Sequence, residues 1–323
     1  MLNNFFDPAI LFFLFGIGAG LLKSNLEIPP PISKFLSLYL LMALGLKGGF
    51  ALSQSGLNMD VAKGLGAAIF LAILVPTIGY QFLKRITGPF DAAAIAATYG
   101  SVSAVTFMTA VQFLDGNKIS YSGHMSAAMA MMESPAILLA VFWVNGIRKK
   151  LSGTSHSHTL QQTLHESLTD GAQLLLLGAM LVGILSGEQG KAMMAPFSVD
   201  LFKGMLAFFL LDMGLTASKN FQYLKDKSLL LIAYAVLGPI IHSLLALGLA
   251  FALNLSLGDS ILLMVLAASA SYIAVPAALK LAIPEASPSL YLGLSLGLTF
   301  PLNIILGIPF YGYLAKWAIP SPI

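Results

Sequence analysis

Apolar residues fall in ten long runs that are separated by short polar turns. The runs cover residues 8–22, 32–51, 61–83, 90–113, 122–144, 171–187, 197–218, 228–252, 258–281 and 289–314. Because about 20 mostly apolar residues span the hydrocarbon core of a bilayer, the runs predict transmembrane helices. The turns carry Pro, Gly, Ser and Asn, as in Pro29-Pro30-Pro31. The pattern predicts an all-α integral membrane protein with ten transmembrane helices.

The two halves of the chain resemble each other. A polar stretch over residues 145–170 divides the helices into five and five. Leu44-Gly45-Leu46 aligns with Met213-Gly214-Leu215, and Ser134-Pro135 aligns with Phe300-Pro301 at nearly the same shift. An odd number of helices per half places the halves in opposite orientations, as in the inverted repeats of secondary transporters. We therefore expect a first repeat at 1–147, a cytoplasmic linker at 148–168 and a second, inverted repeat at 169–323.

The fourth and ninth apolar runs each contain a polar break, at residues 98–106 and 266–274. A shift of 168 residues places Asp91 on Asp259, Ser101 on Ser269 and Ser103 on Ser271. Ten residues of helix rise about 15 Å, half the hydrocarbon core, so both breaks are predicted near the midplane. Small residues that only allow close helix packing are the alternative for either stretch alone. The matched pair favours two crossing discontinuous helices around an ion or substrate.

Broken helices supply charge without ionised side chains. Each second half would direct its N-terminus, with about half a positive charge and free N–H groups, at a small anion. The first halves end in free carbonyls, which together with hydroxyl groups suit a hard cation such as sodium. The candidate substrate-binding residues are Gly100, Ser101, Val102, Ser103, Ala268, Ser269, Ala270 and Ser271. The candidate sodium ligands are Ser101, Ser103, Thr106, Glu133, Ser269, Ser271 and Asn303.

Glu133 lies inside the fifth apolar run, directly before Ser134-Pro135. An intramembrane carboxylate costs roughly 3 kcal/mol or more, which makes a functional role the default. Pro135 also leaves a carbonyl one turn back without its helical donor. Asn303 follows Pro301 at the corresponding depth of the tenth run. Interhelical hydrogen bonds are the alternative for both side chains.

Other polar residues have simpler explanations. We expect Asp212 to serve helix packing or an interface, and Asp91 and Asp259 to cap their helices. His156, His158 and His165 lie in the polar linker without the spacing of a structural zinc site.

Composition agrees with the pattern: 57% of residues are hydrophobic, 10% are charged and the mean hydropathy is +0.85. A net charge of +3 does not indicate nucleic acid, and the absence of cysteine excludes disulfides and thiolate chemistry. Eleven Lys and Arg residues fall on one predicted side and six on the other. The richer side should be cytoplasmic, which places both termini outside an inner (plasma) membrane. The first apolar run is expected to be a retained helix rather than a signal peptide.

Neither His-Glu-x-x-His nor a phosphate-binding loop occurs in the sequence. We therefore expect a transporter without a cofactor, with sodium as coupling ion. An intramembrane hydrolase that pairs His124 with Ser101 or Ser103 is a less favoured alternative, and so is a channel.

Several motifs resemble the sodium-dependent bicarbonate transporter family. They are Gly100-Ser101-Val102-Ser103, the run from Ala267 to Ala277, the run from Ile283 to Tyr291, and Thr299 to Asn303 with Gly307-Ile308-Pro309. The resemblance implies inward symport of bicarbonate with sodium, with bicarbonate held by backbone amides where the broken helices cross.

The resemblance also implies an assembly and partners. It implies a homotrimer, and a PII-like regulatory protein on the cytoplasmic face. The same resemblance implies a core and a gate domain. We assign helices 3–5 and 8–10 to the core and helices 1, 2, 6 and 7 to the gate. Another small or organic anion carried by the same fold is the alternative substrate.

Overall fold

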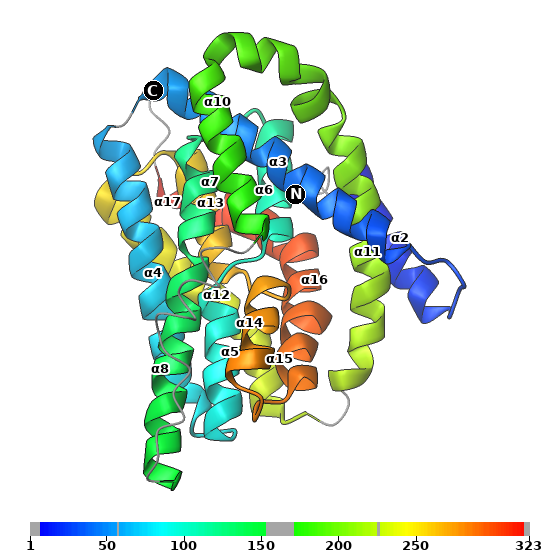
Figure 1. Ribbon diagram of the computed structural model, residues 1–323, viewed down its shortest axis with the longest axis vertical. Helices are drawn as coiled ribbons and strands as arrows, with labels where there is room; N and C mark the ends of the chain where they lie inside the picture. Colours follow the sequence, from blue (N-terminus) through cyan, green and yellow to red (C-terminus); the bar gives the residue numbers. More distant parts are fainter. Residues whose placement is uncertain (1–6, 57, 153–170, 225–226, 320–323) are drawn as a thin grey trace.

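The computed structural model describes residues 7–56, 58–152, 171–224 and 227–319, and all regular secondary structure in these ranges is helical (Figure 1). The first half holds α2 (Pro8–Leu21), α3 (Pro30–Ser55), α4 (Met59–Leu83), α5 (Pro89–Gly100), α6 (Ala104–Gly116), α7 (His124–Met131) and α8 (Glu133–Ser152). The second half holds α10 (Gly171–Ala195), η1 (Pro196–Asp200), α11 (Phe202–Asn220), η2 (Phe221–Leu224), α12 (Leu229–Leu253), α13 (Leu257–Ala268), α14 (Ala274–Ala282), α15 (Pro288–Leu294), η3 (Ser295–Thr299), α16 (Phe300–Leu302), η4 (Asn303–Gly307) and α17 (Ile308–Ala318).

Seven helical runs in the described ranges are long and apolar enough to cross a membrane, and α2 and α13 are shorter apolar helices. The chain is therefore a multi-pass membrane protein. The predicted segments 171–187 and 197–218 belong to one helical run, Gly171–Leu224. That run kinks at Gly187, whose φ of 54° is readily adopted by glycine. The arrangement of ten helices in two inverted repeats stays a prediction, and most of the linker at 148–168, with its three histidines, lies outside the described residues.

Helix ends follow local sequence signals. The Asp7 carboxylate accepts a hydrogen bond from Ala9 N at 2.8 Å and so caps α2. Asn58 caps α4 by accepting from the N–H groups of Asp60 and Val61, both at 3.0 Å. Asn254 ends α12 in the left-handed conformation that asparagine tolerates. Local capping therefore sets where these helices start and stop.

Helices α2 and α11 approach each other closely enough to require glycine. A Cβ on Gly16 would lie 2.4 Å from the Leu211 carbonyl oxygen, and one on Gly214 would lie 2.2 Å from the Phe13 carbonyl oxygen. Helix α3 packs against α10 in the same close manner. Small residues at such crossings let backbones touch in a bilayer, where lipid supplies no hydrophobic drive.

The two aspartates expected to cap their own helices instead hold loops of the other half. Ser256 caps α13, and its hydroxyl accepts from Asp259 N at 3.2 Å. The Asp259 carboxylate accepts from the Ser122 N–H at 2.7 Å and from its hydroxyl at 2.8 Å. Asp91 accepts from Ser287 N at 2.7 Å. The capping prediction was wrong because partners more than a hundred residues away compete better for these carboxylates than the helix N–H groups.

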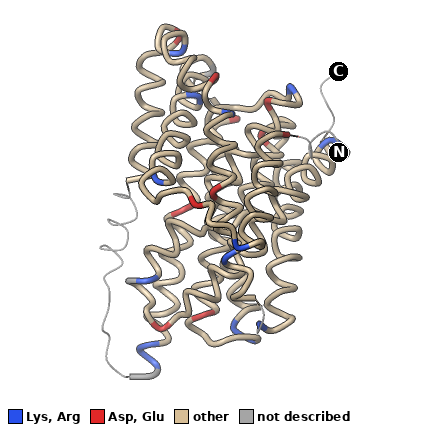
Figure 2. Tube along the Cα trace, turned by 90° about the vertical axis from the view of Figure 1, so that its right-hand side faces the viewer, with Lys and Arg blue, Asp and Glu red and all other residues tan. Residues whose placement is uncertain are grey.

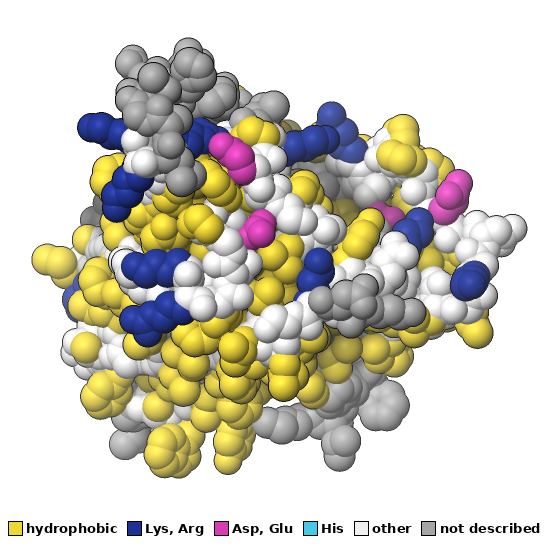
Figure 3. All heavy atoms as spheres, turned by 90° about the horizontal axis from the view of Figure 1, so that it is seen from below, with side chains coloured by type: hydrophobic (Ala, Val, Ile, Leu, Met, Phe, Trp, Pro, Cys, Tyr) yellow, Lys and Arg dark blue, Asp and Glu magenta, His cyan; other side chains and the backbone are white. Residues whose placement is uncertain are grey.

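Charged residues lie mainly toward the two ends of the long axis (Figure 2). The lower face carries scattered Lys and Arg side chains on a largely apolar surface (Figure 3).

Arg148, near the end of α8, holds Glu285 in the turn before α15. Its Nε donates to Oε1 at 2.8 Å, and its Nη2 donates to Oε2 at 2.7 Å. This bidentate hydrogen bonding lowers the pKa of Glu285.

Glu285→Gln should lower the melting temperature in detergent at neutral pH, and the difference from wild type should shrink on acidification. Because the folded-state pKa of Glu285 is depressed, its contribution is present above the ordinary glutamate pKa and is lost as pH falls through the depressed value. The Glu285 side chain is 37% exposed, so solvent screening keeps the contribution below about 1 kcal/mol. Thermal unfolding across pH measures it, with Lys63→Ala in an exposed pair as a control without effect. A pH-independent difference would contradict the assignment.

Candidate functional site

The break predicted in the fourth run falls at Ser101–Ser103, between α5 and α6. The backbone is extended at Ser101 and Ser103, and α6 restarts at Ala104. The Ser103 hydroxyl accepts from Thr106 N at 3.2 Å and so caps the new helix. The break therefore ends one helix and starts another within three residues, as the polar pattern predicts.

The break predicted in the ninth run falls at Ser269–Ile273, between α13 and α14. The backbone turns extended at Ser269, and α14 begins at Ala274. The Ser271 hydroxyl accepts from Val275 N at 3.3 Å, in the first turn of α14. Both interrupted helices therefore use a serine from the break to hold the start of their second half.

The two breaks contact each other directly. Ser103 N donates to the Ser269 hydroxyl oxygen at 3.1 Å. Ser271 N donates to the Thr98 carbonyl oxygen at 2.8 Å. These bonds satisfy backbone groups that would otherwise be unpaired inside a bilayer. They also occupy two of the amides predicted to bind an anion. Thr106 N and Val275 N are bonded to the Ser103 and Ser271 hydroxyls, and Pro276 has no N–H, which leaves the N–H groups of Ala104, Val105 and Ala274 for that role.

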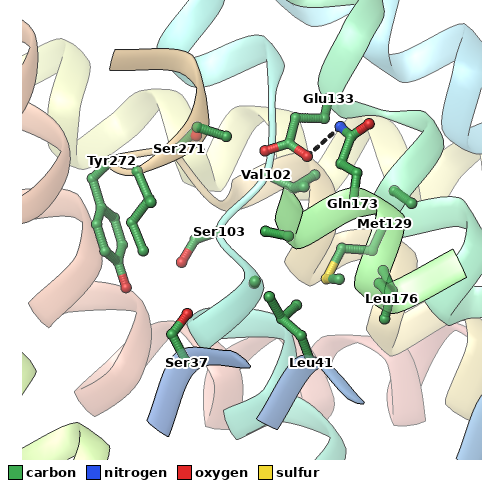
Figure 4. Close-up of a pocket in the computed structure, with 15 residues that line it drawn as sticks. Ser37, Leu41, Val102, Ser103, Met129, Glu133, Gln173, Leu176, Ser271 and Tyr272 are labelled. Atoms are coloured by element: carbon green, nitrogen blue, oxygen red, sulfur yellow. Dashed lines mark hydrogen bonds between the residues drawn. The ribbon is translucent and has the colours of Figure 1, made fainter. Parts of the chain in front are cut away.

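A cavity of about 60 Å³ lies beside the crossing (Figure 4). Both half-helices start at it, because Ala104 and Ala274 line it. The hydroxyls of Ser37, Ser103 and Tyr272 point toward one another in this space, and the Tyr272 hydroxyl is buried. The remaining lining residues are Leu41, Val102, Met129, Ala130, Glu133, Ala172, Gln173, Leu176, Ser271 and Ile273. The cavity has room for a small ion with few waters.

The predicted site residues divide into those at the cavity and those behind it. Val102, Ser103, Ser271 and Glu133 line it, whereas Gly100, Ser101, Thr106, Ala268, Ser269, Ala270 and Asn303 do not. The hydroxyl oxygens of Ser101 and Thr106 are buried without a hydrogen-bond partner among the described residues. Such oxygens are suitable ligands for a hard cation.

Asn303 holds the broken end of α13. Its Nδ2 donates to the Ala268 carbonyl oxygen at 2.8 Å, and its Oδ1 accepts from the Tyr311 hydroxyl at 2.9 Å. The interhelical hydrogen bonds considered from the sequence are thus present. A role of Asn303 as a sodium ligand stays a prediction.

Glu133 is the first residue of α8, and the helix from His124 is interrupted directly before it at Met132. The Gln173 side chain on α10 donates a hydrogen bond to the Glu133 carboxylate (Figure 4). Sequence reasoning missed Gln173, Ser37 and Tyr272. Tyr272 lies within the second break, but a single polar residue in α3 or α10 carries no local signal of a site.

A larger cavity of about 660 Å³ adjoins the first and shares Ser37, Tyr272 and Ile273 with it. Lys34 at the start of α3 and Lys219 at the end of α11 line it. Asp212 also lines it and accepts a hydrogen bond from Ser33, so it joins α11 to α3. This vestibule connects the small cavity with the surface around Lys34 and Lys219.

The sequence matches the family model of the Na+-dependent bicarbonate transporter superfamily over residues 8–316. The chain belongs to this superfamily. The match covers nearly the whole chain and includes both helix breaks, and it makes sodium and bicarbonate the substrates that the family implies. No curated protein matches the chain.

Gly100→Ala should destabilise the crossing, because a Cβ there would lie 2.5 Å from Cβ and Cγ of Pro76 on α4. The rigid proline ring cannot turn away, and overpacking of this kind costs about 1–3 kcal/mol. Thermal unfolding in detergent measures the effect. Gly66→Ala is the matched control, because nothing lies near its added methyl group. Equal melting temperatures for the two variants would contradict the close packing.

Proposed function

We propose that this member of the superfamily is a symporter that carries bicarbonate inward together with sodium by alternating access. One observation carries the proposal: the two half-helices α6 and α14 begin at one small cavity that a carboxylate, Glu133, also lines. The helix ends suit an anion and the carboxylate suits a cation. A site with both features fits coupled transport of two oppositely charged ions.

The anion would lie against the two helix starts. Two N-termini together supply about one unit of positive charge and free N–H groups without a buried Lys or Arg. Hydroxyls of Ser37, Ser103 and Tyr272 can donate to bicarbonate oxygens. Among the predicted substrate residues, the lining favours direct contact by Val102, Ser103 and Ser271. The others, Gly100, Ser101, Ala268, Ser269 and Ala270, would position the backbone.

Sodium would bind at Glu133 with hydroxyl oxygens of the breaks. The predicted set Ser101, Ser103, Thr106, Ser269 and Ser271 supplies these oxygens, and those of Ser101 and Thr106 have no partner among the described residues. Without sodium, the Glu133 charge repels an anion, by about 4 kcal/mol for unit charges 4 Å apart at an effective dielectric constant of 20. Sodium at Glu133 removes most of this repulsion. The electrostatics therefore couple the two ions.

The arrangement of cavities supports alternating access. The vestibule opens the site toward the Lys34 and Lys219 side, which the Lys and Arg distribution favours as cytoplasmic. Toward the other side, Lys47 of α3 pairs with Asp115 of α6 at 3.4 Å. In the proposed division, α3 belongs to the gate and α6 to the core, so this pair would close the outer side. Both termini would then lie outside the plasma membrane.

The alternatives are weaker. A cavity of about 60 Å³ favours bicarbonate over a large organic anion on the same fold. A Cβ on Gly64 would lie 2.3 Å from the His124 Nε2, so the imidazole packs against α4, which disfavours a hydrolase that pairs His124 with Ser101 or Ser103. A channel would conduct without sodium coupling.

A homotrimer and a PII-like regulatory partner remain proposals that rest on the family resemblance.

Proteoliposomes with the wild-type protein should take up labelled bicarbonate when an inward sodium gradient is applied. Glu133→Gln should raise the half-saturating sodium concentration at least about tenfold, because the coupling cation loses its charged ligand. Glu188→Gln, in an exposed pair, is the matched control and should behave as wild type. Competition with acetate, sulfate and larger organic anions tests substrate choice. If Glu133→Gln keeps the sodium dependence of the wild type, the assignment of Glu133 as a sodium ligand is wrong.

Asp115→Asn should shift the protein toward the outward-open state, because it removes the ion pair between α3 and α6. The partners are 17% and 33% exposed, so the pair contributes at most about 1 kcal/mol, which changes the equilibrium up to about fivefold. The chain has no cysteine, so Ser37→Cys provides a single label position at the site. Its labelling from the vestibule side should slow when Asp115→Asn is added. An unchanged rate would show that the pair does not hold the outer side closed.

A further inference from the structure

A separate polar cavity of about 260 Å³ lies at the end of α6 remote from the break, between α2, α6 and α17. Asp7, Thr109, Gln112 and Asn117 contribute its polar side chains, and Ile304 and Ile308 part of its apolar wall. It shares no lining residue with the small cavity or the vestibule. The site described above therefore does not account for it.

Charge indicates what this cavity can hold. Of the described residues that line it, Asp7 alone is charged, whereas the vestibule is lined by both signs: Lys34 and Lys219 with Glu27 and Asp212. The Asp7 carboxylate caps Ala9 N through one oxygen, Oδ1. A carboxylate without a lining Lys or Arg disfavours an anion and favours a cation.

Gln112 provides a second, independent observation. The residue is only 7% exposed, and its Oε1 is buried without a hydrogen-bond partner among the described residues. A buried amide carbonyl without a donor costs free energy, whereas a hard cation takes such an oxygen as a ligand. Gln112 lines the same cavity as the Asp7 carboxylate.

Polar residues follow α6 from the outer cavity toward the break. Thr106, Thr109 and Gln112 follow each other at intervals of three residues on α6, so neighbours in the series lie on the same side of the helix. Each step rises about 4.5 Å along the axis. The Thr109 hydroxyl donates to the Val105 carbonyl at 2.8 Å and keeps an oxygen lone pair, and the Thr106 hydroxyl oxygen is buried without a partner among the described residues. The series ends three residues from Ser103.

We propose that the outer cavity is a binding site for a small hard monovalent cation, held by the Gln112 carbonyl and the Asp7 carboxylate. The identity of the cation rests on the proposed function: it is sodium, which moves from outside to the break along the Thr109 and Thr106 oxygens. Cation and anion then approach the crossing by different routes: sodium moves along α6, and the anion moves between the proposed core and gate helices. The acidic outer cavity concentrates sodium before the anion binds.

The test measures sodium-dependent thermal stabilisation of the purified full chain, with choline chloride holding ionic strength constant. Gln112→Leu should raise the sodium concentration for half-maximal stabilisation about fivefold, because one oxygen ligand is lost. Gln112→Glu, which keeps the oxygen and adds charge, should lower it. Gln81→Leu, on the exposed surface of α4, is the matched control and should not change it.

A double variant separates the outer cavity from the site at Glu133. Glu133→Gln should retain part of the sodium stabilisation, and the addition of Gln112→Leu should remove that part. If wild type shows sodium-driven uptake while Gln112→Leu and Gln112→Glu leave its sodium dependence and stabilisation unchanged, the outer site is refuted and the proposed function stands. If wild type shows neither uptake nor stabilisation by sodium, both proposals fail.

Discussion

The structure depends on backbone groups that two interrupted helices satisfy for each other. In the membrane interior, an unpaired N–H or C=O costs several kcal/mol, so a helix can break only where partners are supplied. Ser103 N bonds to Ser269, Ser271 N bonds to Thr98, and Asn303 holds the Ala268 carbonyl. Because these bonds join the two breaks, each break stabilises the other. The starts of α6 and α14 can then face a cavity rather than lipid.

The site combines opposite electrical features within a small volume. Two helix starts are positive, the Glu133 carboxylate is negative and serine or tyrosine hydroxyls are neutral. Neither an anion alone nor a cation alone complements all three kinds of group. Family membership supplies the identity of the ions, and the arrangement supplies a physical reason why they would bind together. Coupling in this view comes from charge neutralisation and does not require a direct contact between the ions.

The movement proposed for alternating access would break contacts between groups of helices. Helices α2 with α11 and α3 with α10 form close pairs through glycine contacts. The Glu133 and Gln173 bond connects α8 to α10, and the Lys47 and Asp115 pair connects α3 to α6. Glu133, which is proposed to bind sodium, therefore also connects two groups of helices. Occupation of Glu133 would then influence both the anion site and the freedom of the groups to move.

Local sequence determined where the helices are, where two of them break and that the chain resides in a membrane. Hydrophobic runs set burial in lipid, and Ser101, Ser103, Ser269 and Ser271 lie where two of these runs are interrupted. Sequence could not show that Asp91 and Asp259 hold loops of the other half, or that Ser37, Gln173 and Tyr272 converge on the site. Helix formation depends on neighbours within one or two turns, whereas these partners meet only after helices far apart in the chain have packed. Tertiary structure therefore decided which polar groups are paired and which, such as the Gln112 carbonyl, remain without a partner among the described residues.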